Sequence, residues 1–175
     1  MLLLALAMFA SAGVKAELVP AEEGIPAPPF PETSAYGWLN SAPLSWAQLH
    51  GKVVLLDFWT FACWNCYRSF PWLNDLEKRL AEKDFRVVGI HSPEFEYEKH
   101  VERLKEKVVQ YQLKHPIMID NDHRMWDAIS NRYWPAFYLI DRQGRIRSLY
   151  VGEMHADGKQ AKALEADLLQ LLAEE

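Results

Sequence analysis

Cys63 and Cys66, separated by two residues, are the side chains of this sequence best suited to carry chemistry. They follow a run, 53–59, that is apolar except for one Asp, and precede apolar residues at three- and four-residue steps, which predicts a buried strand leading into a helix. A thiol at a helix N-terminus faces unpaired backbone N–H groups and the positive end of the helix dipole, which favour the thiolate. Cys63 is therefore predicted to be a nucleophile, and Cys66, one turn further along, is placed to resolve the mixed disulfide that Cys63 forms.

Three other interpretations compete with this redox interpretation of the cysteine pair. A structural disulfide closing a loop of about four residues would stabilise the fold by only roughly 2 kcal/mol. A zinc site needs further ligands, yet the chain has 2 Cys in all, and its 6 His show no tight ligand spacing. Two inert buried thiols are the third alternative. The sequence favours redox chemistry, with no metal and no cofactor expected.

Length and composition limit the classes of protein to which the chain can belong. A single domain of 175 residues with 7 Trp, 7 Tyr and 8 Phe can bury a substantial core, so neither a disordered chain nor a small disulfide-stapled scaffold fits. The net charge of -5, without any basic run, argues against nucleic acid as a partner. The substrate is expected to be a protein or a small molecule.

The N-terminal residues predict export. An apolar run from Leu2 to Ala10 leads to Val14-Lys15-Ala16, which has the form of a signal-peptidase site, so residues 1–16 are expected to be a signal peptide or an uncleaved membrane anchor. No Lys or Arg precedes the run, so a truncated start or the tail of a longer membrane protein would also fit. Residues 17–35 are proline-rich and are expected to form an extended linker before a folded domain at 36–175.

Strands and helices alternate through the predicted domain. Strands are expected at 53–59, 85–90, 117–119, 136–140 and 146–150, and helices from residue 64 onward, over 101–111, around 125–129 and over 161–171. The last two strands are joined by the turn sequence Asp141-Arg142-Gln143-Gly144, which is typical of a hairpin. Parallel strands linked by helices and followed by a hairpin predict an α/β protein with a three-layer sandwich around a mixed sheet.

Several separated motifs resemble one family. Leu56-Asp57-Phe58-Trp59 before Cys63-x-x-Cys66, with Pro71 five residues later, resembles the active-site strand and helix of thioredoxins. The chain is still more similar to the TlpA and ResA group, and within it to the thioredoxin-like domain of DipZ-type proteins, on three motifs in the right order: 57–60, 89–95 and 131–136. The resemblance covers about Trp38 to Gly152. It implies a thioredoxin-like three-layer α/β/α sandwich with a central mixed sheet and a helix-containing insertion.

The resemblance also implies roles for two carboxylates. Asp57 corresponds to the buried carboxylate that takes the proton from the resolving thiol, and its apolar strand should raise its pKa; a surface Asp on an edge strand is the alternative. Glu94 matches a Glu near the cysteines of the ResA group, although it could equally cap the helix that follows Pro93. His91 is interpreted as a packing residue rather than a proton shuttle.

Four further residues are assigned to substrate binding. The resemblance implies that Trp134-Pro135 is a cis peptide bond facing the cysteines, in place of an ordinary trans turn, and the exposed backbone of Trp134 could pair with a substrate segment. Trp64 and Asn65 lie between the cysteines, and Trp64 with Trp134 could form an apolar patch that holds protein substrates. The Trp-Asn dipeptide has neither the Pro nor the His of many thioredoxins and oxidases, so it does not indicate the reduction potential.

The leading functional hypothesis is an exported, monomeric thiol:disulfide oxidoreductase that reduces protein disulfides. DipZ-type proteins also carry a membrane electron-transfer domain and a C-terminal domain that this sequence lacks, which implies a separate membrane donor of the CcdA/DsbD type. An oxidase or isomerase of the same fold is one alternative. A peroxiredoxin-type peroxidase is another, because Thr60 stands three residues before Cys63, although Leu56 occupies the position of that family's Pro. The third is a chaperone that holds copper between the two cysteines and His91.

Overall fold

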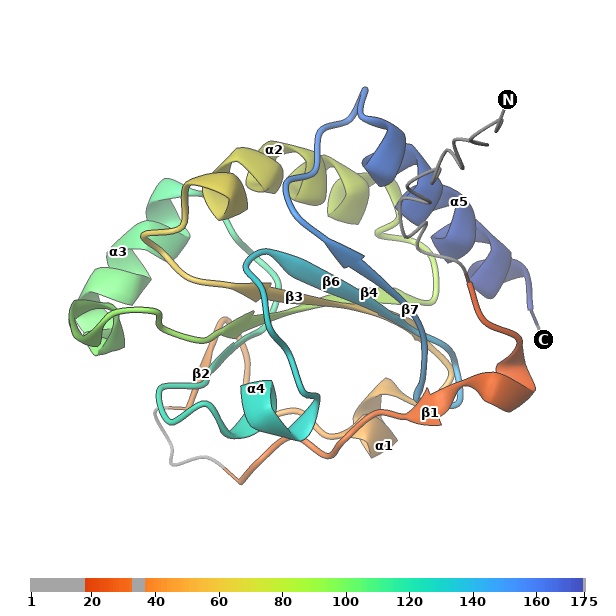
Figure 1. Cartoon of the computed structure of the whole chain (residues 1–175), viewed down its shortest axis with the longest axis horizontal. Helices are drawn as coiled ribbons and strands as arrows, with labels where there is room; N and C mark the ends of the chain where they lie inside the picture. Colours follow the sequence, from red (N-terminus) through yellow and green to blue (C-terminus); the bar gives the residue numbers. More distant parts are fainter. Residues whose placement is uncertain (1–17, 33–36, 175) are drawn as a thin grey trace, which may run out of the picture.

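Residues 18–32 and 37–174 are described by the structure, a computed structural model, so the predicted signal peptide or anchor lies outside the described residues. Within them, one sheet has the strand order β1-β7-β6-β3-β4-β5-β2, with helices on both faces (Figure 1). The strands are β1 (Ile25–Pro26), β2 (Trp38–Leu39), β3 (Val53–Trp59), β4 (Phe85–His91), β5 (Ile117–Ile119), β6 (Ala136–Ile140) and β7 (Arg145–Val151). The α-helices are α1 (Trp46–Leu49), α2 (Trp64–Arg79), α3 (Val101–Gln110), α4 (Arg124–Ala128) and α5 (Lys159–Ala173), with 3-10 turns η1 (Ala21–Glu23) and η2 (Glu96–Lys99).

The sheet is mixed, as the sequence predicts. Strands β3, β4 and β5 run parallel to one another, whereas β6 is antiparallel to β3 and β7 is antiparallel to β6. Helices α2, α3 and α5 cover one face and α1 and α4 cover the other (Figure 1). The predicted thioredoxin-like α/β/α sandwich is therefore confirmed.

Strand β3 is buried along its whole length and supplies both halves of the core. Side chains alternate between the faces of a strand, so Val53, Leu55 and Trp59 contact the layer that contains α2 and α5. The intervening residues contact the layer that contains α1 and α4. Asp57 shares the first face, and the strand therefore directs a carboxylate toward the helix that carries the cysteines.

Residues 18–32, which we call the N-terminal strap, lie within the segment 17–35 that the sequence predicts to be an extended linker. The strap runs along the outer edge of β7, where Ile25 pairs with Ile146, and the Val19 amide donates to the Arg147 carbonyl at 2.9 Å. Its far end packs through Phe30, whose ring stacks on Trp46 at 4.9 Å. The folded unit thus begins before residue 36, because these backbone groups bind an open sheet edge.

Arg147 fastens the strap to the rest of the fold. Its side chain is 3% exposed, and its guanidinium donates to the Val19 carbonyl at 2.7 Å and to the Asp141 carboxylate at 3.2 Å. Two further bonds reach Glu174, just past the end of α5. One buried cation therefore joins the strap, the β6–β7 turn and the C-terminal helix.

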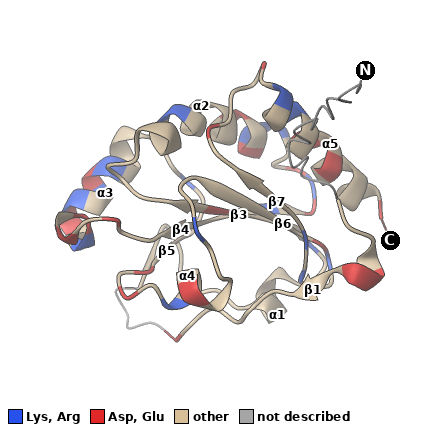
Figure 2. Ribbon diagram, viewed as in Figure 1, with Lys and Arg blue, Asp and Glu red and all other residues tan. Residues whose placement is uncertain are grey.

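Charged residues of both signs are interspersed on the helices, as Figure 2 shows for α3 and α5. This pattern is typical of solvated helix faces and fits the balance of charges in the sequence. None of the helices in the described ranges is long and apolar enough to cross a lipid bilayer.

Candidate active site

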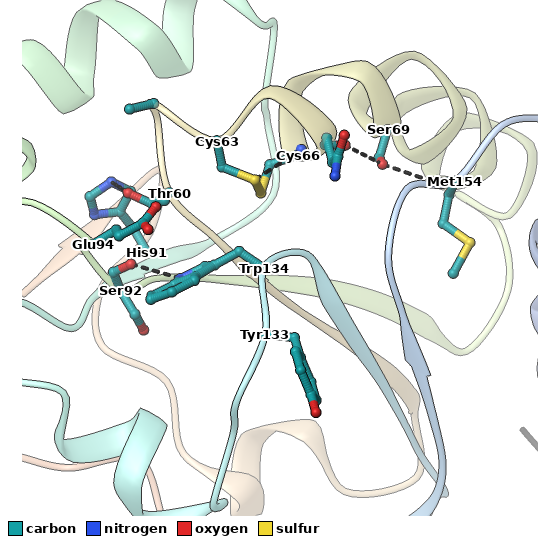
Figure 3. Close-up of a disulfide and its surroundings, with 12 residues drawn as sticks. Thr60, Cys63, Cys66, Ser69, His91, Ser92, Glu94, Tyr133, Trp134 and Met154 are labelled. Atoms are coloured by element: carbon teal, nitrogen blue, oxygen red, sulfur yellow. Dashed lines mark hydrogen bonds between the residues drawn. A yellow bond between two sulfur atoms is a disulfide. The ribbon is translucent and has the colours of Figure 1, made fainter. Parts of the chain in front are cut away.

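The two cysteines form a disulfide at the start of α2 (Figure 3). Their Cα atoms are 5.3 Å apart, Cys63 is the N-cap residue of the helix, and its sulfur accepts a hydrogen bond from the Cys66 amide at 3.2 Å. Cys63 is partly exposed, whereas Cys66 is fully buried. A substrate sulfur can therefore reach Cys63 but not Cys66, and the helix N-terminus is placed to stabilise a thiolate on Cys63.

Asp57 lies beneath this helix, on the same face of the sheet as the cluster that contains Cys66. Its side chain is 1% exposed, and neither carboxylate oxygen has a hydrogen-bond partner within the described structure. Burial raises the pKa of Asp57 to about 8, because an ionised carboxylate is poorly solvated there. The group is protonated at neutral pH, yet it is close enough to its pKa to exchange a proton, as a general base for a thiol requires.

Gly89 on β4 pairs with Asp57 and leaves room for the groups around it. A Cβ atom at this position would lie 3.0 Å from the Trp59 Nε1 and 3.2 Å from both the His115 Nε2 and the Ile117 Cγ1. These neighbours are buried rings and a branched side chain that cannot withdraw freely.

We expect Gly89→Ala to lower the free energy of unfolding by about 1–3 kcal/mol, because an extra methyl group in a close-packed core forces its neighbours to shift. Urea unfolding followed by tryptophan fluorescence measures the change. Gly144→Ala is not a suitable control because its φ of 78° disfavours any side chain. Arg86→Ala is a better control, because Arg86 is exposed on the same strand and its side chain lies outside the core. Equal stabilities for Gly89→Ala and Arg86→Ala would contradict the prediction.

Glu98 of η2 is a site residue that the sequence reasoning missed. Its side chain is 0% exposed and accepts from the Thr60 hydroxyl and, at 2.8 Å, from the Ala62 amide, immediately before Cys63. The Glu94 side chain that the resemblance implies for this place is exposed, and only its backbone amide takes part, donating to Glu98 at 2.8 Å. The prediction for Glu94 is therefore corrected: the inward-facing carboxylate comes from four residues later in the chain.

His91 packs against the loop of residues 60–62, which connects β3 to α2. Its ring is fully buried, stacks on Phe61 with centroids 5.6 Å apart, and brings its Nε2 to 3.5 Å from the Thr60 hydroxyl. Burial lowers the pKa of His91 to about 3, so the ring is neutral at physiological pH. The position supports the interpretation of His91 as a packing residue.

The loop before β6 forms the opposite wall of the site. The Trp134–Pro135 peptide bond is cis, and the Trp134 ring packs at a tilt against Trp126 with centroids 4.2 Å apart. The Trp134 indole donates to the Ser92 carbonyl at 2.9 Å (Figure 3). Asn131 braces the same loop by donating to the Tyr133 carbonyl at 3.0 Å. The Trp134 side chain is thus held in place, and its backbone precedes the first ladder residue of β6.

Trp64 and Trp134 pack against different aromatic side chains. Trp64 is 63% exposed and packs edge-on against Tyr67, and Asn65 beside it is also exposed. Further exposed aromatic side chains of the described residues are Phe95, Tyr97 and Tyr133. Tyr133 points away from the disulfide in Figure 3. The exposed position of Tyr133 could have been suspected from the sequence because it precedes Trp134. No motif in the sequence indicates that Phe95 and Tyr97 are exposed.

The geometry of Thr60 argues against the peroxidase alternative. The Thr60 hydroxyl has one hydrogen, which it donates to Glu98, so it offers no donor to Cys63 as a peroxidase threonine would. Over residues 18–32 and 37–174, no three His, Cys, Asp or Glu side chains are grouped as metal ligands.

A cysteine pair with this spacing at a helix N-terminus, above a buried carboxylate and opposite a proline loop, defines a thioredoxin-fold thiol-disulfide oxidoreductase. The chain belongs to the Redoxin family, whose model matches residues 23–168. Thiol-disulfide oxidoreductase YkuV of Bacillus subtilis is 31% identical over 147 residues, which cover 83% of this chain and 95% of YkuV.

Other relatives are much longer than the chain. Protein DipZ of Mycobacterium tuberculosis is 38% identical over 67% of this chain, and the chloroplastic protein SUPPRESSOR OF QUENCHING 1 of Arabidopsis thaliana is 40% identical over 73% of it. The matched regions are only 17% and 12% of those proteins.

Solved structures agree with the fold. A thioredoxin-like protein in its oxidised form superposes with a TM-score of 0.72 at 30% identity, covering 86% of this chain and 96% of that one. A thiol-disulfide isomerase from Corynebacterium glutamicum gives a TM-score of 0.70 at 25% identity, covering 85% of this chain and 98% of the other. The chain is therefore a thioredoxin-like thiol-disulfide oxidoreductase with its CxxC-spaced pair at Cys63 and Cys66, as the resemblance implied.

Proposed function

We propose that this oxidoreductase reduces disulfides in protein substrates, with Cys63 as the attacking and Cys66 as the resolving cysteine. The observation that carries the proposal is the difference between the two sulfurs at the start of α2. Cys63 is partly exposed and caps the helix, whereas Cys66 is fully buried above the face that holds Asp57. An exposed thiolate meets the substrate first, and the buried thiol acts only after the substrate is attached.

The reaction consists of two thiol-disulfide exchanges. The Cys63 thiolate attacks one substrate sulfur, so a Cys63–substrate disulfide forms and the other substrate sulfur leaves as a thiolate. Asp57, as its carboxylate, takes the proton from the Cys66 thiol, and the Cys66 thiolate then attacks the Cys63 sulfur. The second substrate thiolate departs, and the Cys63–Cys66 disulfide is left. Two electrons pass from the dithiol to the substrate, and the substrate thiolates take up two protons.

The proline loop is proposed to hold the substrate during these steps. Trp134 stands outside the β6 ladder, and its side chain is fixed by Ser92 and Trp126. Its backbone is thereby available for an extended substrate segment to pair with as an added strand. Trp64 and Asn65 flank Cys63 on the other side and are proposed to contact the same segment.

Export and a membrane electron donor of the CcdA/DsbD type complete the proposal. They are supported by the apolar run from Leu2 to Ala10, by the small-residue sequence after it, and by the similarity to DipZ. The dithiol is consumed in each turnover, so a donor must reduce the Cys63–Cys66 disulfide again before the next one.

Equilibration of the cysteine pair with glutathione tests the direction of electron flow. We expect a reduction potential near about -270 mV, the value typical of a reductant, whereas a potential near about -120 mV would identify an oxidant.

Trapping tests the separate roles of the two cysteines. We expect Cys66→Ser to accumulate mixed disulfides with substrate proteins through Cys63, because the resolving thiol is missing, and mass spectrometry of the adducts locates the bond. The matched variant Cys63→Ser should trap almost nothing, since Cys66 is buried. Adducts found mainly on Cys66 would reverse the assignment.

A further inference from the structure

Glu98 is a buried carboxylate that accepts every hydrogen bond in which its side chain takes part within the described residues. One oxygen accepts from the Thr60 hydroxyl and the Ala62 amide, and the other accepts from the Glu94 amide at 2.8 Å and the Phe95 amide at 2.9 Å. An ionised carboxylate is an acceptor only, so this arrangement matches it fully, and three of the four partners are backbone amides that can only donate; the Thr60 hydroxyl alone could receive the hydrogen of a protonated acid. The hydrogen bonds therefore select a negative charge at full burial.

Within the described residues, no positive side chain neutralises this charge. Among the ion pairs formed by the part of the chain that the structure describes, none includes Glu98. His91 approaches from β4 but reaches only the Thr60 hydroxyl and is neutral at physiological pH. Asp57 on β3 and Asp120 just after β5 are also buried at this end of the sheet, and both are carboxyls, so neither supplies a positive charge. The charge of Glu98 is thus supported by backbone amides and one hydroxyl alone.

The carboxylate of Glu98 is linked to Cys63 through a short backbone path. The Ala62 amide that binds Glu98 belongs to the residue next to Cys63, and the Cys63 amide itself donates to the Thr60 carbonyl at 3.2 Å. Like charges in a poorly solvated environment repel strongly, so a carboxylate here disfavours a thiolate on Cys63. The N-terminus of α2 acts in the opposite direction, because its amides and dipole favour the thiolate.

We propose that Glu98 is a positioning residue that anchors the Thr60–Ala62 loop and whose negative charge disfavours the Cys63 thiolate, shifting the cysteine pair toward the disulfide and making the dithiol a stronger reductant. The inference rests on the proposed exchange chemistry of Cys63 and adds to it the feature that sets its direction. It also assigns a function to the segment 94–98, which follows β4 and places the Glu98 carboxylate next to the loop that leads into α2.

Substitution of Glu98 by Gln tests the proposal, because it removes the charge at nearly constant size. The introduced amide still accepts from the Thr60 side of the loop through its carbonyl, whereas its NH2 group cannot accept from the two backbone amides on the other side. We expect the equilibrium constant with glutathione, measured at about pH 9.5 where Cys63 is largely ionised in both proteins, to shift about tenfold toward the dithiol in Glu98→Gln, which corresponds to about 30 mV. The pH at which Cys63 is half alkylated in the reduced protein should fall in the same variant.

Matched variants separate charge from loop packing. Thr60→Val removes one hydrogen bond to Glu98 but no charge, Glu98→Asp keeps the charge on a shorter side chain, and Glu94→Gln removes an exposed charge nearby. All three should remain within about threefold of the wild-type equilibrium. An equal shift in Thr60→Val and Glu98→Gln would overturn the proposal in favour of loop packing, and a folded Glu98→Gln protein with the wild-type equilibrium would overturn it outright.

A measurement on the wild-type protein keeps the proposal testable if Glu98→Gln fails to fold. We expect Cys63 to be half alkylated above about pH 8, near the value of a free cysteine, despite its position at a helix N-terminus. Half alkylation at or below about pH 7, the value typical of thioredoxin, would overturn the proposal. If the wild-type pair did not exchange with glutathione at all, the proposed function itself would fail, which is a distinct result.

Discussion

Asp57→Asn should slow the resolution of mixed disulfides at neutral pH by about 100-fold or more while leaving the first attack by Cys63 much less affected. The buried carboxylate is the only group that the proposed mechanism uses to take the Cys66 proton, and general bases contribute about 10²–10⁴-fold to such steps. Asn has nearly the same shape and cannot accept that proton. Single-turnover kinetics with a model disulfide, quenched at intervals, separates the mixed disulfide from the final products.

The same substitution should change the pH dependence of stability. The pKa of Asp57 is about 8 in the fold against 3.8 for an unperturbed Asp, so between these values the folded protein retains a proton that the unfolded chain has lost. Stability therefore falls as the pH rises through this window, and the loss, roughly 5 kcal/mol in full, is complete only above about pH 8. Asn cannot ionise and removes this loss.

Urea unfolding of both proteins at pH 5, 7 and 9 measures this effect. Other groups titrate in both proteins, so the difference between the two curves reports on Asp57 alone. The Asn variant should gain stability relative to the wild type by a few kcal/mol between pH 5 and pH 9. Parallel curves would show that the carboxyl is not the titrating group.

Arg147→Met should lower the free energy of unfolding by about 3–5 kcal/mol. The guanidinium is buried between the Asp141 and Glu174 carboxylates and the Val19 carbonyl, and removing it leaves Asp141 as a buried charge without its cation. Met retains most of the apolar contacts of the arginine stem. Urea denaturation measures the global change, and limited proteolysis within residues 18–32 measures release of the strap.

Two comparisons make the interpretation of Arg147→Met specific. Arg145→Met removes a half-buried arginine that donates to the Ala21 carbonyl of the same strap, and it should cost less than about 1 kcal/mol. Adding Asp141→Asn to Arg147→Met should restore part of the lost stability, because the unpaired charge disappears while Oδ1 still accepts from the turn amides. A double variant as unstable as the sum of its parts would argue against the buried charge as the cause.

The central elements of the fold could be predicted because their sequence signals are local. Residues 53–59 are apolar except for Asp57, and the structure gives β3 the same bounds. The strap and α1 could not be predicted in this way. Five prolines and four glutamates make residues 17–35 look like a linker, and what holds residues 18–32 is the edge of β7 and the side chain of Arg147, more than 100 residues further along.

The candidate site shows the same limit. The cysteines follow from their spacing and their place between a strand and a helix, and Asp57 and the Trp134–Pro135 loop follow from the resemblance to thioredoxins. The choice between Glu94 and Glu98 does not, because it depends on where η2 begins. The chain enters this turn at Phe95, whose amide is bound by Glu98, and that geometry sends Glu94 outward and Glu98 into the core. Two glutamates four residues apart look equivalent in the sequence until this turn is known.

The N-terminal strap also has a consequence for the solubility of the protein. Open sheet edges are templates on which other chains can add strands and aggregate, and natural proteins protect them with short strands and with proline. Here the outermost strands β1 and β2 are each two residues long, and β1 ends at Pro26, which has no N–H to offer a neighbour. The strap thus protects the start of β7 from edge-to-edge association.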